Sequence, residues 1–67
     1  MSIGENVANL RKRKNLSQEE LAAMVGISRP MISQIERGTK MLSITLGQEV
    51  AKALDCKLDD LISDKPV

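Results

Sequence analysis

The residues with the clearest capacity for chemistry are side chains along one edge of a short helical segment. Between Ser28 and Gly38, Ile32 and Ile35 are three positions apart and fall on one helical face. The outward positions that remain are Arg29, Pro30, Ser33, Gln34 and Arg37. Guanidinium, amide and hydroxyl groups on a rigid helix form directed hydrogen bonds, and arginine adds positive charge. This chemistry suits recognition of a polar or anionic partner.

Two short helices joined by a glycine must position those side chains. Ser17 and Glu20 have the spacing of a capping box, which predicts that the first helix begins next to Ser17. Gly26 is predicted to end this helix, because glycine readily adopts the left-handed conformation. Ser28 then caps the second helix, and Gly38 ends it.

The apolar residues of this pair predict a helix-turn-helix over about residues 17–37. Small Ala22 allows the helices to approach closely, and Gly26 allows a sharp reversal. The positions expected to anchor the second helix against the first are Leu21, Ala22, Val25, Ile27, Ile32 and Ile35. The same residues also fit an interior helix pair with a solvated outer face. Spacing alone favours DNA binding but leaves this alternative open.

The rest of the chain is also helical in pattern. A capping box at Ser2 and Glu5 starts a helix that ends near Asn15, after a basic run at residues 11–14. Ser43 is predicted to cap a helix reaching about residue 54, and a last short helix covers about residues 58–62. Strand-like alternation is absent, so we predict an all-α fold. We expect residues 1–67 to form a single domain with a short loose tail at 63–67.

Composition is that of a globular protein, with 42% hydrophobic and 28% charged residues. The net charge of +1 hides an asymmetry. Residues 1–40 hold seven Lys or Arg against four Asp or Glu, whereas residues 41–67 hold three against five. A DNA-binding surface has to be basic only locally, so the first half is the better candidate, although an ordinary solvated surface would show the same split.

Several classes of function are disfavoured by missing residue types. The chain has no histidine and one cysteine, so it cannot build a zinc cage or an internal disulfide. It has no aromatic residue on which single-stranded bases could stack. Four of the serines fall at expected helix starts, namely Ser2, Ser17, Ser28 and Ser43, and no glycine-rich phosphate loop is present. We therefore expect no enzymatic activity, no cofactor, no metal and no small-molecule substrate.

Location is inferred from the same kind of evidence. No apolar run approaches the length of a membrane span, and no signal peptide is recognisable. Cys56 is most simply a small buried apolar residue in a reducing compartment. We expect a cytoplasmic protein that does not contact a membrane.

Three stretches of the sequence resemble the lambda-repressor-like (Cro/XRE-type) family. They are Leu16-Ser17-Gln18-Glu19-Glu20-Leu21-Ala22, Val25-Gly26-Ile27-Ser28-Arg29 and Ile32-Ser33-Gln34-Ile35-Glu36-Arg37-Gly38. Val50-Ala51-Lys52-Ala53-Leu54 followed by Leu58-Asp59-Asp60-Leu61 is similar as well. The resemblance implies a five-helix DNA-binding domain, sequence-specific binding of double-stranded DNA, usually as a dimer, and a role in transcription regulation.

The resemblance also implies a role for individual residues. Base-reading positions in the major groove are Arg29, Pro30, Ser33 and Gln34. Arg29 suits guanine and Gln34 suits adenine, whereas Pro30 offers at most apolar contact with a thymine methyl. Contacts to the DNA backbone are implied for Gln18, Ser28, Arg37, Thr39 and Lys40. Gln18 could instead brace the recognition helix.

One pair of charged residues is assigned to structure. The resemblance implies that Arg11 pairs with Glu36, which would tie the first helix to the end of the third. A phosphate contact for Arg11 is the alternative. Met31 is ambiguous, and we favour packing over contact with DNA.

The functional hypothesis is a repressor or autoregulator of phage, restriction-modification controller or plasmid and toxin-antitoxin type. A homodimer on a palindromic operator is expected, because one small module buries little DNA surface. The candidate dimer contacts are Met41, Leu42, Ile44 and the region 58–62. The competing hypothesis is a protein-interaction adaptor that uses the same helices, with Met31, Met41 and Leu42 on its surface and weak DNA binding.

Overall fold

The computed structural model describes residues 2–62, and within this range the ordered elements are helices without strands. They are α1 (Ile3–Arg13), α2 (Gln18–Val25), α3 (Arg29–Arg37), α4 (Ile44–Ala53) and α5 (Leu58–Ile62). The prediction of an all-α, five-helix fold is confirmed. The tail expected at residues 63–67 lies outside the described residues.

Four of the helices begin at a serine that accepts a hydrogen bond from a backbone N–H three residues later. These N-caps are Ser2, Ser17, Ser28 and Ser43. At Ser2 and Ser17 a glutamate three residues on completes a capping box. Hydrogen bonds from the backbone N–H and then the hydroxyl of Ser17 lower the pKa of Glu20, since they favour its charged form.

Helices α1 to α4 are each followed, within two residues, by a residue in the left-handed conformation. Gly26 has a φ of 83° and Gly38 a φ of 81°, and each directly follows its helix. Asn15, after α1, has a φ of 57°, a conformation that asparagine tolerates better than most residues. α5 begins without a serine, and at its start the Lys57 N–H donates to the Asp60 carboxylate at 3.0 Å.

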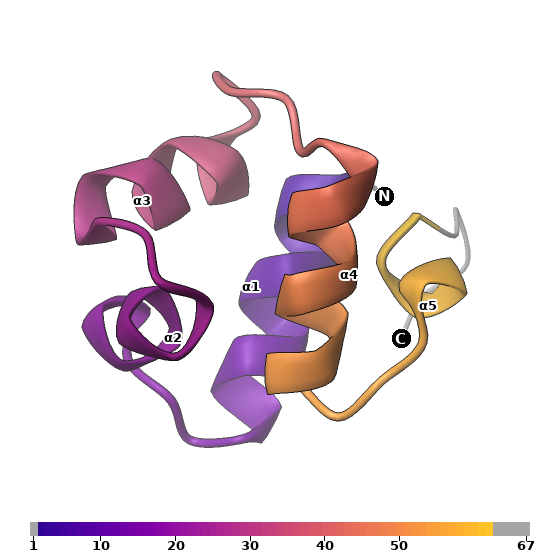
Figure 1. Ribbon diagram of the computed structural model, residues 1–67, viewed down its shortest axis with the longest axis horizontal. Coiled ribbons are helices and arrows are strands. Elements are labelled where there is room, and N and C mark those ends of the chain that lie inside the picture. The colour runs from indigo at the N-terminus through magenta and orange to yellow at the C-terminus, as the bar shows by residue number, and fades with distance from the viewer. Residues whose placement is uncertain (1, 63–67) are drawn as a thin grey trace.

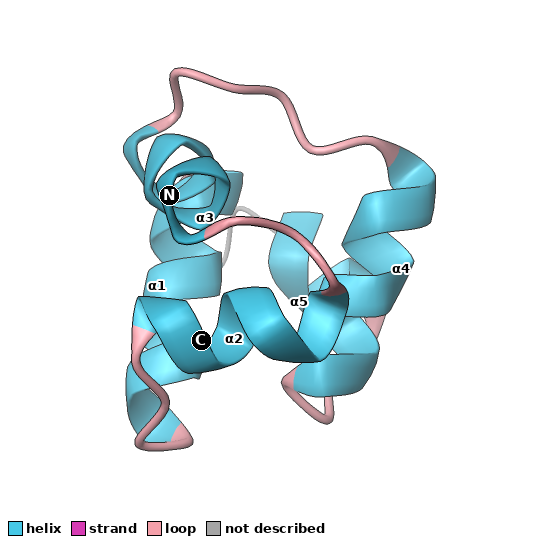
Figure 2. Cartoon of the chain, turned by 60° about the vertical axis from the view of Figure 1, so that its left-hand side comes forward, coloured by secondary structure: helices cyan, strands magenta, loops and turns pink. Residues whose placement is uncertain are grey.

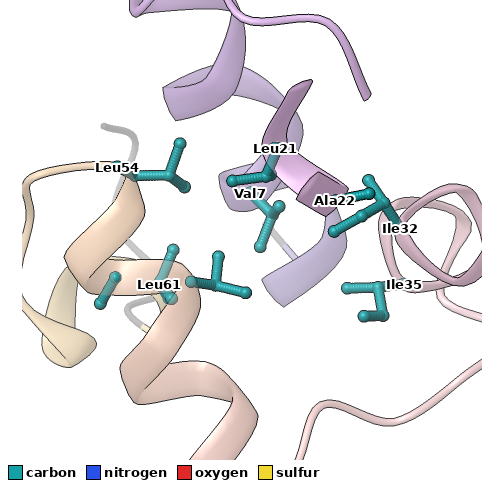
Figure 3. Close-up of a cluster of buried hydrophobic side chains, with 9 residues drawn as sticks. Val7, Leu21, Ala22, Ile32, Ile35, Leu54 and Leu61 are labelled. Atoms are coloured by element: carbon teal, nitrogen blue, oxygen red, sulfur yellow. The ribbon is translucent and has the colours of Figure 1, made fainter. Parts of the chain in front are cut away.

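The core joins all five helices (Figure 3). Its buried apolar side chains are Val7, Leu21, Ala22, Ile32, Ile35, Val50, Ala51, Leu54 and Leu61. Asn6 is also fully buried, and its Nδ2 donates to the carbonyl of Leu61 at 2.8 Å, which ties α1 to the end of α5. Ile3 and Ile62, which helical periodicity groups with the core, remain 38% and 52% exposed.

The arrangement separates α2 and α3 from α5. In Figure 1, α1 and α4 lie in the middle, with α2 and α3 on one side and α5 on the other. Hence α3 packs against α1 and α2, whereas α5 packs against α1 and α4. Among the described residues, no helix is long and apolar enough to cross a membrane.

Candidate nucleic-acid interface

The turn between α2 and α3 holds the two helices at a steep angle. In Figure 2, α2 is seen from the side while α3 is viewed nearly along its axis. The N–H groups of Gly26 and Ile27 both donate to the carbonyl of Ala22, at 2.8 and 3.0 Å, and so close the end of α2. Ile32 and Ile35 are 0% and 2% exposed and fix the inner face of α3 against α1 and α2.

The outer side of α3 is open, as the base-reading hypothesis requires. Arg29, Pro30 and Gln34 are exposed, and Ser33 is half-buried. Met31 is also half-buried and packs against the core, in keeping with the packing role that we favoured. The side of α3 that faces away from the core thus presents a guanidinium and an amide to solvent.

The residues expected at the DNA backbone lie at the two ends of α3. Arg37 is exposed in the last turn of α3, and Thr39 and Lys40 are exposed after it; the Thr39 hydroxyl donates to the carbonyl of Gln34 at 3.2 Å. At the other end, the Ser28 hydroxyl accepts from the N–H of Met31 at 3.3 Å. Its capping role therefore occupies one acceptor position of Ser28.

Arg11 forms a two-point ion pair with Glu36. Its Nε and Nη2 donate to the two carboxylate oxygens at 2.7 and 3.1 Å, and Nη1 donates to the carbonyl of Leu16 at 2.8 Å. The side chains of the pair are only 11% and 8% exposed. Paired donors on a carboxylate give a directional contact, so the last turn of α3 is tied to α1 and to the start of α2.

Gln18 extends this pair towards the base-reading end of α3. Its Nε2 donates to Glu36 at 2.9 Å, and its Oε1 accepts from Arg29 Nη1 at 3.3 Å. These two hydrogen bonds would let Gln18 brace α3, the alternative role proposed for it. The link from Gln18 to Glu36 could not be predicted from the sequence, because no local pattern indicates a contact between residues 18 positions apart.

The net charge of α3 and the loop after it is positive. From residue 28 to residue 40 the basic residues are Arg29, Arg37 and Lys40, and the one acid is Glu36, which is held by Arg11. Glu20 is exposed at the start of α2, but its carboxylate is directed back to the Ser17 N–H. A positive outer edge on a rigid helix suits a polyanion with patterned hydrogen-bonding groups.

The family model described as Helix-turn-helix matches residues 7–61 of the chain. The control protein C.BamHI of Bacillus amyloliquefaciens is 40% identical over 61 residues, which cover 90% of this chain and 75% of the relative. Among solved structures, the P22 c2 repressor in complex with synthetic operator 9T has a TM-score of 0.90 at 32% identity, covering 97% of this chain and 98% of that one. The restriction-modification controller protein C.AhdI of Aeromonas hydrophila gives 0.86 at 35% identity, over 90% and 91%.

Proposed function

The chain belongs to the helix-turn-helix family, and we propose that it regulates transcription by binding a specific double-stranded DNA sequence. In this proposal α3 lies in the major groove and its outward side chains read base edges. The similar proteins include a repressor solved on its operator and two controllers, so repression or autoregulation is the proposed direction of control.

One observation carries the proposal: α3 is fixed from behind while its outer edge stays free. Ile32 and Ile35 are buried and Glu36 is paired with Arg11, so the helix is held from its inner face and its position does not depend on Ser33 or Gln34. Arg29 and Gln34 are therefore available for hydrogen bonds to bases, Arg29 to guanine and Gln34 to adenine. Ser33 and Pro30 complete the proposed base-reading set.

Contacts to the DNA backbone are proposed on both sides of α3. The first N–H groups of α2 have no acceptor within the helix, so they are suited to a phosphate. Gln18, at that position, uses one amide N–H on Glu36 and has a second left for the same phosphate. Further contacts are supplied at the end of α3 by Arg37 and after it by Thr39 and Lys40, and Ser28 lies at its start.

We propose a homodimer on a palindromic operator. Two recognition helices about 34 Å apart would read half-sites one helical turn apart. Large apolar side chains are exposed on segments outside α2 and α3: Met41 is 92%, Ile44 73% and Ile62 52% exposed. Leu42 lies between Met41 and Ile44 in the sequence. It is half-buried and completes the proposed contact region.

Selection of bound duplexes from a random library tests the proposal directly. We expect an enriched sequence made of two inverted half-sites. Binding to that duplex should weaken steeply with salt, since each neutralised phosphate contributes about 0.9 to the slope of log affinity against log salt.

The adaptor hypothesis makes the opposite prediction. An adaptor would enrich no sequence, and its weak binding to duplex DNA would be unaffected when Arg37 is replaced. Sedimentation of the wild type and of Met41→Glu tests the dimer separately. A wild type that stays monomeric both free and on the selected duplex would exclude the homodimer.

A further inference from the structure

We propose that Gly4, in the first turn of α1, sets the tilt of the recognition helix α3 and is therefore a positioning residue for DNA recognition. The inference rests on the proposed function for its consequence and on packing geometry for its origin. Gly4 contacts no DNA in this proposal. It acts through the last turn of α3.

Gly4 is buried directly against the main chain of α3. A Cβ added at Gly4 would lie 2.5 Å from the carbonyl oxygen of Glu36 and 2.9 Å from its carbonyl carbon, and closer still to the carbonyl oxygen of Ile35. These are backbone atoms of a helix, so no side-chain rotation can relieve the overlap. A methyl group here requires that α3 and α1 move apart.

Local conformation does not explain the glycine. Gly4 lies inside α1 and is not among the residues with positive φ, unlike Gly26 and Gly38. At a helical position alanine is the better helix former, so glycine at this site weakens α1 taken alone. The close approach of α3 is the feature of the structure that requires a residue without a side chain.

Gly4 and Arg11 together form a two-point seat for the end of α3. They are seven positions apart, which is two helical turns, and so lie on the same face of α1. Gly4 lies against the backbone of Glu36, and Arg11 holds the Glu36 carboxylate. The distance between α1 and the last turn of α3 is thus defined both by contact and by an ion pair.

The start of α3 has an anchor of its own, the turn at Gly26. The contact of Gln18 with Arg29 adds to it, although Gln18 also bonds Glu36. Pushing one end while the other stays in place tilts the helix. Moving Glu36 O from 2.5 Å to an ordinary contact of 3.4 Å shifts that end by about 0.9 Å. Over nine residues at 1.5 Å each, this is a tilt of roughly 4°.

Such a tilt matters because the proposed contacts lie at both ends of one rigid helix. When Arg37 moves, either the backbone contacts after α3 or the base contacts at Arg29 must leave their best geometry. Hydrogen bonds weaken with misalignment, so the selected sequence should lose more affinity than random duplex, which is held by charge.

The test compares Gly4→Ala with Gly47→Ala, a matched change in another helix. At Gly47 the added Cβ would lie 3.0 Å from Leu58 Cδ1 and 3.5 Å from Leu42 Cδ2, which are the ends of flexible side chains. Both variants are made in an Asp55→Gly parent, because the φ of 56° at this position favours glycine and adds stability. We expect this margin to offset part of the stability that Gly4→Ala loses.

Two measurements are made on each variant. Residual dipolar couplings of backbone amides give the orientation of α3 relative to α1, and titration gives affinity for the selected duplex and for random duplex at low salt. For Gly4→Ala we expect α3 to reorient by several degrees and the selected duplex to bind about tenfold more weakly, with less than a twofold change on random duplex. For Gly47→Ala we expect neither change.

The inference is overturned if α3 keeps its orientation in Gly4→Ala, or if Gly47→Ala reorients it equally. Unchanged preference for the selected duplex in a variant whose α3 has tilted would also overturn it. A parent that binds no duplex would refute the proposed function instead. The couplings would still decide whether Gly4 positions α3.

Discussion

The inner face of α3 is buried against the rest of the fold, whereas its outer face is open to solvent. On the inner face, Ile32 and Ile35 are buried and the Glu36 side chain is only 8% exposed. On the outer face, Gln34 and Arg37 are exposed to solvent. The fold thus constrains the inner residues, while the outer residues can change without loss of packing. A domain built in this way can acquire a new DNA sequence preference and keep its fold.

Arg29 stands between these two cases. It is exposed, yet its Nη1 donates to Gln18 at 3.3 Å, and Gln18 in turn donates to the buried carboxylate of Glu36. One outer residue is therefore oriented by the inner network. Substitutions on the two faces should separate stability from recognition, and Glu36 should affect both.

The largest effect is expected at Ile32, the most buried anchor of α3. Ile32→Ala removes three carbons from a fully buried site and leaves a cavity, which costs about 2–5 kcal/mol of unfolding free energy. For a domain of this size each kcal/mol lowers the melting temperature by about 4–8 °C. Thermal unfolding followed by circular dichroism measures the loss. A melting temperature within about 3 °C of the wild type, which corresponds to a loss of less than about 1 kcal/mol, would contradict the inner-face assignment.

The second effect is expected at Glu36. Glu36→Ala leaves the Arg11 guanidinium, 11% exposed, without its carboxylate, and frees Gln18. Because one partner of a nearly buried pair is lost, we expect a loss of about 2–3 kcal/mol in urea unfolding. Lys14→Ala is the control, since Lys14 meets Asp55 at 3.5 Å in an exposed pair that contributes under about 1 kcal/mol. Equal losses in the two variants would show that burial of the Arg11 pair has no energetic consequence.

The helices and their ends could be predicted from the sequence because they depend on local chemistry. A serine with its N–H partner three residues later, as at Ser17 or Ser28, is a contact within one turn. A glycine at Gly26 or Gly38 likewise indicates a left-handed backbone at its own position. The inner face of α3 followed from the three-residue spacing of Ile32 and Ile35.

Contacts between distant segments could not be predicted in the same way. The Arg11 pair was inferred only from family resemblance, because nothing in the spacing of residues 25 positions apart indicates it. Gly4 looks like a weak point in a helix until α3 is placed against it. Asn6 reads as a polar surface residue, yet it is buried on the carbonyl of Leu61, 55 positions away.

On the outer face, Gln34→Ala should change recognition without changing stability. The side chain is exposed and lies away from the core, so the free energy of unfolding should stay within about 0.5 kcal/mol of the wild-type value. Affinity for the selected duplex should fall by about 1–3 kcal/mol, with relaxed preference at one or two base positions. Repeating the selection with the variant measures this. If all sequences lose affinity equally, Gln34 is a backbone contact and the proposed base-reading set is wrong at that position.

The smallest effect is expected at Lys40, beyond the end of α3. Its ammonium is exposed and is proposed to meet a phosphate, which carries no sequence information. Lys40→Ala should weaken binding to every duplex by a similar factor and reduce the salt slope by about 1, while the enriched sequence stays the same. Lys52→Ala, on α4, is the matched control, because it removes the same charge outside α2, α3 and the loop after them. If Lys52→Ala reduced the slope as much as Lys40→Ala, charge on the whole molecule would drive the association, and the outer edge of α3 would have no special part in it.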